Sequence, residues 1–387
     1  MLTRFVPELT GLRVAGRRVS IVLGCLVLPA VLLATFFSVA FVSPAGDRIE
    51  EPAFGWDFRA TWRAAGDVLG GESPYAPPTR AALDGEDQYV YPPGPAFAAI
   101  PFRLFSFDMA AVLFGLLLVA SVVLTLRLLG VRDWRCYGIV FTWVPVLESV
   151  RLGAISILLT LGTALAWRYR DHAYVGAAAV AAIVAAKLFL WPLALWLAVT
   201  GRLRQAAFAV TAGLVATFAA WAAIGFQGLR DYGAMLGTLS DLVGPKSYSL
   251  AALSHALGLS ESAERFLPAL VGGALLVALV LVARRLGPDR DSRALILALA
   301  AGLALSPIAW THYFALLIVP IALARPRLSP LWLLPLVFWL SPNQSEGELW
   351  RICVVLGVAA LTFAATLGVP FPRPFRPSRL AFPAAKA

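Results

Sequence analysis

Four ionisable side chains in this sequence lie beside apolar or aromatic residues: Asp57, Lys187, Lys246 and His312. A carboxylate can accept a proton from a hydroxyl group, and ammonium or imidazole groups can hold a phosphate through charge-assisted hydrogen bonds. Aromatic residues close to these positions, or at the start of an apolar run, could contact apolar or sugar surfaces: Trp56, Tyr91, Trp310 and Tyr313. Together these residue types indicate a site for an anionic substrate that is linked to a lipid.

Asp57 also has a purely structural interpretation. It precedes Trp62, Ala65 and Leu69, whose spacing predicts a short helix that lies along a membrane surface. An acid in the first turn of a helix is stabilised by the helix dipole and by the exposed backbone N–H groups. A capping role for Asp57 therefore stays open beside a catalytic one.

The other polar positions have alternatives of the same kind. Lys187 interrupts apolar sequence, which is typical of a functional site or of a lysine that extends to the membrane surface. Tyr91, at the head of an apolar run, also fits an interfacial aromatic belt. Glu148 and Arg151 form a small polar island and can pair with each other. His312 belongs to no H-x-x-x-H or H-E-x-x-H spacing, so the sequence predicts no zinc site.

The composition indicates where these residues must be held. The chain has 387 residues, of which 60% are hydrophobic and only 14% charged. That is too little polar surface to cover soluble domains of this size, so we expect an all-α polytopic membrane protein. The net charge of +10 does not indicate nucleic acid, because the arginines lie in short breaks between apolar runs. Three widely spaced cysteines predict neither a disulfide framework nor a metal site.

The apolar runs predict about twelve membrane crossings. Five runs are long enough for a core of about 30 Å: 19–42, 109–129, 206–226, 266–284 and 349–369. Seven are shorter: 136–150, 152–167, 173–186, 188–200, 294–309, 312–324 and 329–341. We take 94–107 as an interfacial or re-entrant piece, with the N-terminus in the cytoplasm. The cytoplasmic breaks then hold 21 basic and five acidic residues and the outer segments 11 and 17, as the positive-inside rule expects.

This topology defines the expected organisation of the chain. Residues 1–369 form one integral-membrane domain in a bacterial plasma membrane, with outer loops at 43–93 and 227–265. The basic, Pro/Arg-rich tail 370–387 and the N-terminus both lie in the cytoplasm. Asp57, Lys187, Lys246 and His312 all fall on the outer side. The sequence contains no P-loop and no dinucleotide-binding fingerprint, which disfavours ATP-driven pumps.

Five segments, taken in order, resemble glycosyltransferase family 87. They are Asp57-Phe58, Tyr91-Pro92-Pro93, Arg151 to Ser156, Lys187 with Pro192, and Ser306 to Tyr313. The resemblance runs from about residue 19 to 340 and implies the membrane-embedded GT-C fold, with short interfacial helices in the first outer loop. It also implies an inverting α-1,2-mannosyltransferase that uses polyprenyl-phosphate-mannose, as in the synthesis of phosphatidylinositol mannosides and lipomannan.

The resemblance assigns roles to particular residues. Asp57 is implied as the general base, and the donor phosphate is implied to bind at Lys187 and His312. To these we add Lys246, a second outer lysine, as a candidate phosphate-binding residue from its own place in the sequence. The expected lining of the substrate pocket is Trp56, Arg59, Tyr91, Arg151, Trp310 and Tyr313. The expected partners are a lipid-linked sugar donor, a glycolipid or polysaccharide acceptor and membrane lipids. The resemblance implies no nucleotide and leaves a divalent metal open.

Two departures from the family pattern keep alternatives open. Gly153-Ala154-Ile155-Ser156 stands where the family often has Gly-Gln-hydrophobic-Asn, and 246–249 stands where it often has an Asn-Gln-Ser-like segment. The donor could therefore be decaprenyl-phosphoryl-arabinose in place of the mannose donor. Two non-enzymatic functions also stay open, namely a transporter of lipid-linked sugars and a scaffold for cell-envelope assembly.

Overall fold

The computed structural model describes residues 54–84 and 88–368, and every regular element within these ranges is a helix. The α-helices are α2 (Trp56–Gly70), α3 (Arg80–Leu83), α4 (Pro93–Ala99), α5 (Phe107–Leu128), α6 (Trp134–Val140), α7 (Val144–Leu152), α8 (Ser156–Arg168), α9 (Val175–Ala186), α10 (Pro192–Val199), α11 (Leu203–Ala223), α12 (Leu229–Val243), α13 (Leu250–Ala256), α14 (Glu261–Ala283), α15 (Arg290–Leu305), α16 (Ile318–Ala324) and α17 (Leu349–Leu367). The 3-10 helices are η1 (Ile100–Leu104), η2 (Leu188–Leu190), η3 (Gly244–Lys246), η4 (Thr311–Leu317) and η5 (Pro330–Leu340). The prediction of an all-α chain is confirmed for the described residues.

Four helices of the described residues are long and apolar enough to cross a membrane: α5, α11, α14 and α17. They correspond to four of the five long apolar runs, and the fifth, 19–42, lies outside the described residues. Helices α7 and α8 make a fifth candidate if they count as one span, although they are bent by 116°. The structure thus supports a membrane protein but does not confirm the count of twelve crossings. Most of the shorter runs fold as helices or helix pairs of 16 residues or fewer.

The segment 94–107 folds as α4 and η1, which together cover 12 residues before α5 begins. At 1.5 to 2.0 Å of rise per residue such a pair extends about 20 Å, which is short of the roughly 30 Å core. This agrees with an interfacial or re-entrant piece.

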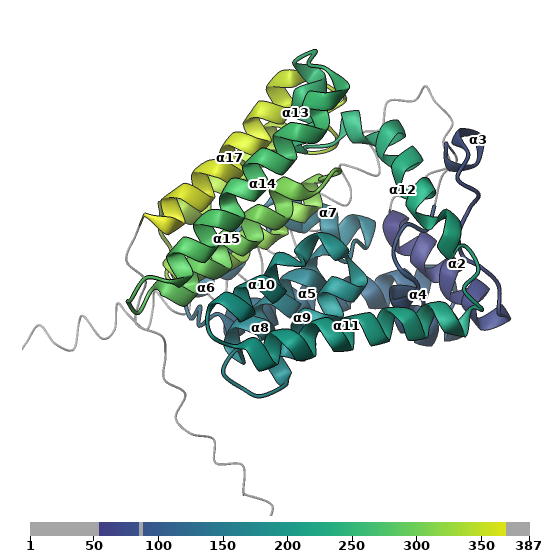
Figure 1. Ribbon diagram of the computed structural model, residues 1–387, viewed down its shortest axis with the longest axis horizontal. Coiled ribbons are helices and arrows are strands. Elements are labelled where there is room, and N and C mark those ends of the chain that lie inside the picture. The colour runs from purple at the N-terminus through teal and green to yellow at the C-terminus, as the bar shows by residue number, and fades with distance from the viewer. Residues whose placement is uncertain (1–53, 85–87, 369–387) are drawn as a thin grey trace, which may run out of the picture.

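The helices form two packed groups (Figure 1). Helices α13, α14, α15 and α17 lie against one another, and α5, α8, α9, α10 and α11 form the second group. Helix α10 packs on α15 and joins the groups. Helices α2, α4 and α12 lie at one end of the molecule, and α2 packs directly on α4. Three tryptophans, Trp143, Trp196 and Trp332, are completely buried in the core.

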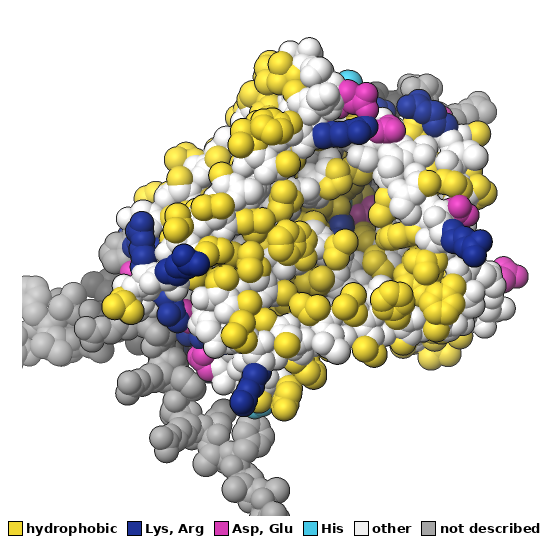
Figure 2. Space-filling view, in the orientation of Figure 1, with side chains coloured by type: hydrophobic (Ala, Val, Ile, Leu, Met, Phe, Trp, Pro, Cys, Tyr) yellow, Lys and Arg dark blue, Asp and Glu magenta, His cyan; other side chains and the backbone are white. Residues whose placement is uncertain are grey.

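The outer faces of the long helices are apolar. Only 22% of the most apolar stretch of α11 and of α14 is buried within the protein. Leucine, valine and phenylalanine side chains point outwards from them, as at Phe218, Val215, Val277 and Leu281. Apolar side chains are spread over much of the face in Figure 2. An apolar surface of this extent is what contact with lipid requires and what a soluble monomer avoids.

Hydrogen bonds and ion pairs join the breaks that the charge bias assigns to the cytoplasm. Arg202 lies 2.6 Å from Asp171 and 2.6 Å from Asp291, which brings the 171, 202 and 291 breaks together. The Leu328 N–H donates to Asp133 at 3.1 Å, which joins two further breaks. The pairing agrees with one shared side for the breaks within each group.

The segments assigned to the other side are joined in the same way. The Tyr232 hydroxyl donates to the Val90 carbonyl at 2.9 Å and connects the two predicted outer loops. The Tyr248 N–H donates to the Ala309 carbonyl at 2.7 Å and connects the second loop to the segment before η4. Each of these bonds joins two segments that the predicted topology assigns to the same side of the membrane.

Candidate active site

One small cavity collects most of the residues that the sequence singled out. It has a volume of about 120 Å³. Its lining comes from α2, from the segment before α4, from the break after α9 and from the start of η4. The lining residues are Trp56, Asp57, Ala60, Gln88, Val90, Tyr91, Lys187, Trp310, His312 and Tyr313. Figure 2 shows a hollow in the middle of the apolar face, with a basic and an acidic side chain at its bottom.

Asp57 is positioned by the docking of the α2 N-terminus on the end of α7. The residue before α2, Gly55, has a left-handed backbone (φ 83°) and donates its N–H to the Arg151 carbonyl at 2.7 Å. Helix α7 ends in a left-handed Gly153, with hydrogen bonds from Gly153 to Val150 and from Ala154 to Ser149 that close its last turn.

Gly153 has a second reason to be glycine. A Cβ atom there would lie 2.6 Å from Phe58 Cβ and 3.6 Å from Gly55 Cα, so α2 could not approach as closely. Phe58 is buried and stacks on Phe114 of α5 with ring centroids 4.3 Å apart. The segment from Arg151 to Ser156 therefore fixes where α2 starts, and with it the place of Asp57.

The helix that the spacing of Trp62, Ala65 and Leu69 predicts is present as α2. Ala65 is buried together with Phe58 and Val68, and Leu69 is exposed. The docking of Gly55 on Arg151 sets the rotation of the helix, and this contact is invisible in the local periodicity.

Lys187 is held by aromatic ring faces. Helix α9 ends at Ala186 because Lys187 adopts an extended backbone, with φ −154° and ψ 107°. Its ammonium group lies 3.8 Å from the centroid of the Tyr313 ring and 5.1 Å from that of Tyr91. The Phe189 ring stacks on the Tyr313 ring, with the ring centroids 5.3 Å apart. Cation–π contacts of this kind orient an ammonium without neutralising it, so its charge stays available to an anion.

His312 faces Asp57 across the cavity. Its Nε2 atom lies 3.9 Å from Asp57 Oδ2, which is too long for a direct hydrogen bond but leaves the two groups in electrostatic contact. The imidazole is buried, with 4% of the residue exposed. The neighbouring Thr311 hydroxyl donates to the Asn343 carbonyl at 2.6 Å and anchors the first turn of η4.

Three tyrosines hold the wall formed by residues 88–91, of which Tyr89 is buried and Tyr75 and Tyr232 are half-buried. The Tyr89 hydroxyl donates to the Pro92 carbonyl at 2.6 Å, Tyr75 donates to the Tyr91 carbonyl at 2.9 Å, and Tyr232 donates to Val90. Burial raises the pKa of Tyr75 and of Tyr232, so both remain protonated donors at any physiological pH. The aromatic motif at 89–93 therefore belongs to the cavity wall.

Three of the residues predicted for the site lie outside this cavity. The Arg151 side chain pairs with Glu148 at 3.0 Å, as the sequence allowed, and only its backbone supports α2. The Arg59 guanidinium lies 4.8 Å from the Phe107 ring centroid. Lys246 is exposed in η3, where its carbonyl accepts the Ser345 N–H. None of the three lines the cavity, because the packing of α2 and η3 directs them to other surfaces.

Gln88 lines the cavity and was missed by sequence reasoning. Its amide group donates to the Ala82 carbonyl at 3.1 Å. The only sequence signal is its place directly before the Tyr89-Val90-Tyr91 motif. A glutamine amide offers both a donor and an acceptor to a hydroxylated ligand, but nothing local separates it from any other loop glutamine.

The chemistry open to this cavity follows from its three ionisable groups. Asp57 can accept a proton, and Lys187 and His312 can face a group that gains negative charge. Among residues 54–84 and 88–368 no group of three His, Cys, Asp or Glu side chains is arranged to hold a metal ion. The arrangement fits displacement of an anionic leaving group by a hydroxyl nucleophile.

Comparison with known proteins gives the family. The profile of glycosyltransferase family 87 matches residues 89–320, which is more than half of the chain. A polyprenol-phosphate-mannose-dependent alpha-(1-2)-phosphatidylinositol pentamannoside mannosyltransferase of Mycolicibacterium smegmatis is 28% identical over 306 residues, covering 73% of this chain and 67% of the relative. A protein of the same name from Mycobacterium tuberculosis is 25% identical over 305 residues, covering 71% and 65%.

The chain thus aligns with about two thirds of the length of each of these relatives. No solved structure matches it. The resemblance predicted from the five motif segments is confirmed, since the profile spans four of them wholly or in large part. The chain belongs to glycosyltransferase family 87 and is a glycosyltransferase.

Proposed function

We propose that this glycosyltransferase moves a mannosyl group from polyprenol-phosphate-mannose to a hydroxyl group of a glycolipid at the outer face of a bacterial plasma membrane. The names of the two relatives support mannose as the sugar and a phosphatidylinositol mannoside as the class of acceptor. The observation that carries the proposal is the convergence of Asp57, Lys187 and His312 on one cavity with aromatic walls.

Asp57 acts as the general base. The acceptor oxygen attacks the anomeric carbon of the donor sugar while its proton passes to the Asp57 carboxylate. A new C–O bond forms as the bond between the anomeric carbon and the phosphate oxygen breaks. The reaction is a single inverting displacement, so a β-linked donor gives an α-linked product.

Lys187 and His312 act on the leaving group. The electron pair of the broken bond goes to the phosphate of the lipid, where negative charge accumulates in the transition state. The Lys187 ammonium is fixed over Tyr313 before the substrate binds, so its attraction needs little reorganisation during the reaction. His312 lines the same cavity, with its Nε2 atom 3.9 Å from the Asp57 carboxylate.

The outer location of the site rests on the arginine bias. The breaks that carry most of the basic residues pair with one another through Arg202, Asp171 and Asp291, while the site lies among the acid-rich segments. With the protein in this orientation, the lipid-linked donor, the acceptor and the cavity all lie on the outer side of the membrane.

A transfer assay tests the proposal. Membranes that contain the wild type or Asp57→Asn are incubated with a lipid extract and radiolabelled polyprenyl-phosphate-mannose, and in parallel with labelled polyprenyl-phosphate-arabinose. We expect label from the mannose donor in a new glycolipid with the wild type alone. Sensitivity of that label to an α-mannosidase checks the inverted linkage.

The other outcomes decide between the alternatives. Label from the arabinose donor alone would replace mannose by arabinose as the sugar. Absence of transfer from both donors, with the protein shown to be folded, would favour a transporter or a scaffold. Normal transfer by Asp57→Asn would remove the general-base role while leaving the transferase in place.

A further inference from the structure

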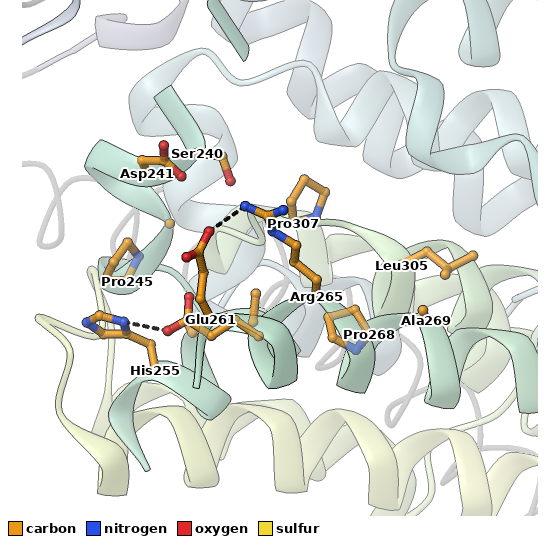
Figure 3. Close-up of a pocket in the computed structure, with 14 residues that line it drawn as sticks. Ser240, Asp241, Pro245, His255, Glu261, Arg265, Pro268, Ala269, Leu305 and Pro307 are labelled. Carbon is orange, nitrogen blue, oxygen red and sulfur yellow. Dashed lines mark hydrogen bonds and ion pairs between the residues drawn. The ribbon is translucent and has the colours of Figure 1, made fainter. Parts of the chain in front are cut away.

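A second, larger cavity lies apart from the candidate active site. Its volume is about 440 Å³. Its walls are the end of α12, η3 with α13, the first turns of α14 and the end of α15 (Figure 3). All these elements belong to, or adjoin, the predicted second outer loop at 227–265. No residue of this cavity lines the first one.

The polar side of the second cavity is rich in carboxylates. His255 Nδ1 lies 2.9 Å from Glu264, and Arg265 pairs with Glu261, as the dashed lines in Figure 3 mark. Asp241 comes from a different helix, α12, and has no hydrogen bond or ion pair within the described residues. Its acceptor oxygens are therefore available to a ligand.

The apolar side is formed by rigid residues. Pro268, Leu305 and Pro307 line it together with alanines. Leu305 is fixed because α15 packs so closely on Gly272 that a Cβ atom there would lie 2.4 Å from the leucine side chain. Pro268 has no N–H, so it removes the helical hydrogen bond to the Glu264 carbonyl and leaves a further acceptor in this wall.

The charges exclude one class of ligand. Three carboxylates face one guanidinium and one imidazole, so the cavity repels a phosphate, in contrast to the Lys187 site. Carboxylates and carbonyls accept hydrogen bonds from neutral hydroxyl groups, and proline and leucine faces pack against the C–H faces of sugar rings. An uncharged, polyhydroxylated ligand fits both sides.

A short segment connects the two cavities. Leu305 and Pro307 line the second, while Trp310 and His312 line the first. Trp310 is three positions after Pro307, so their Cα atoms are at most about 11 Å apart. The Ala309 carbonyl between them accepts the Tyr248 N–H, which ties the α13 wall to the same segment.

We propose that the second cavity binds the uncharged oligosaccharide part of the glycolipid acceptor and presents one of its hydroxyl groups to Asp57. This inference rests on the proposed function and adds to it the place where the acceptor is recognised. The donor phosphate and the acceptor sugars then occupy cavities of different charge. The shared 305–312 segment sets the distance between them.

A variant that fills the cavity tests this assignment. Ala269 lines the cavity from α14, and Leu270, next to it, is 54% exposed and points away. With a phosphatidylinositol tetramannoside as acceptor, we expect Ala269→Trp to raise the acceptor KM about tenfold or more, the equivalent of one lost subsite. The donor KM changes less than about twofold, because the Lys187 site is untouched. Leu270→Trp is the matched control and leaves both constants unchanged.

A charge variant keeps the test valid if the bulky one fails to fold. Asp241→Asn removes one negative charge from the cavity without changing the shape of the side chain. We expect the KM for the glycolipid acceptor to rise about threefold to tenfold, with little change in kcat. Asp231→Asn, on an exposed turn of the same helix outside the cavity, is its control. An unchanged acceptor KM in both Ala269→Trp and Asp241→Asn would overturn the assignment.

A binding measurement separates this inference from the proposed function. The Asp57→Asn protein in detergent is titrated with labelled phosphatidylinositol tetramannoside, and free mannotetraose or phosphatidylinositol competes. We expect competition by the oligosaccharide alone, and none in Ala269→Trp. If the wild type transfers no sugar yet this pattern holds, the proposed reaction fails and the sugar site stands. Competition by phosphatidylinositol alone would overturn the sugar site.

Discussion

Two regions of this protein each combine acidic, basic and aromatic side chains, and they differ in how closely the acidic and basic groups approach one another. At one end of the bundle, Asp291 and Asp171 share Arg202, with both contacts at 2.6 Å, and Arg170 lies 3.9 Å from the centroid of the Trp167 ring. We call these residues, with Arg290, the Asp291 network. In the candidate active site, Lys187 lies 3.8 Å from the Tyr313 centroid, but His312 and Asp57 stand 3.9 Å apart around a cavity.

The difference shows what separates a structural ion network from a site that can act. In the Asp291 network every charged group lies within 4 Å of an opposite charge, and these contacts tie α10, α11 and α15 together. In the cavity the ammonium is oriented by ring faces and the imidazole is held out of hydrogen-bonding range of the carboxylate. The Lys187 ammonium and the Asp57 carboxylate thus both line a cavity that substrate can enter, whereas the charges of the Asp291 network face one another.

The largest expected effect is the loss of catalysis in Asp57→Asn. Removal of a general base lowers turnover about 10²- to 10⁴-fold, the equivalent of about 3–5 kcal/mol. The amide keeps the shape of the carboxylate, so the unfolding midpoint should stay within a few degrees of the wild type. Turnover under saturating donor and acceptor, with thermal unfolding in the same detergent, checks both. A large loss of stability would instead make Asp57 part of a structural network like that of Asp291.

Asp291→Asn should produce the opposite pattern. It leaves Arg202 partly uncompensated in a half-buried place, and we expect a loss of about 2–3 kcal/mol in the free energy of unfolding. Turnover per folded molecule should be unchanged. Denaturant unfolding and active-site titration measure the two quantities.

Asp171→Asn is the matched control, since Asp171 contacts the same arginine with 71% of its side chain exposed. That change should reduce the unfolding free energy by less than about 1 kcal/mol. Equal losses for the two aspartates would show that burial does not set the strength of this network.

Gly153→Ala should affect the active site from a distance. Its left-handed backbone and the 2.6 Å approach to Phe58 Cβ together should cost about 2 kcal/mol or more, and α2 must move to relieve the clash. Because α2 carries Asp57, turnover should also fall. Gly71→Ala is the control: it is also left-handed, but no atom lies within 4 Å of its added Cβ. A fall in turnover of the same size in Gly71→Ala would contradict the docking role of Gly153.

The smallest expected effect depends on pH and concerns the end of the molecule that holds Asp133. The Arg135 guanidinium beside Asp133 holds the pKa of that carboxyl at about 2, below its ordinary range. A lowered pKa in the folded state contributes stability that is present above about pH 4 and is lost as pH falls towards 2. Asp133→Asn should thus lower the melting temperature by a few degrees at pH 6 and by much less at pH 2.5. A difference that is independent of pH would assign the effect to the helix cap alone.

Much of the candidate site could be predicted from the sequence because its residues are chemically out of place. A lysine, a histidine and an acid within apolar and aromatic sequence stand out without any coordinates, and Asp57, Lys187 and His312 all line the cavity. Lys246 stood out in the same way, yet it lies on another surface, because local sequence does not show which break packs against which. Gln88 has no such local signal. It lines the cavity because it belongs to the 88–91 wall, which hydrogen bonds from Tyr75, Tyr89 and Tyr232 hold in place.

The sequence by itself determined that this chain is helical, lies in a membrane and belongs to glycosyltransferase family 87. Hydrophobicity, charge bias and motif order are properties of the sequence itself, so they can be recognised without knowing how the helices pack. Tertiary structure decided which polar breaks meet, how α2 is rotated on Gly153 and where the two cavities open. Those features depend on contacts between residues far apart in the sequence, such as Gly55 with Arg151 and Tyr248 with Ser341, and no local pattern encodes them.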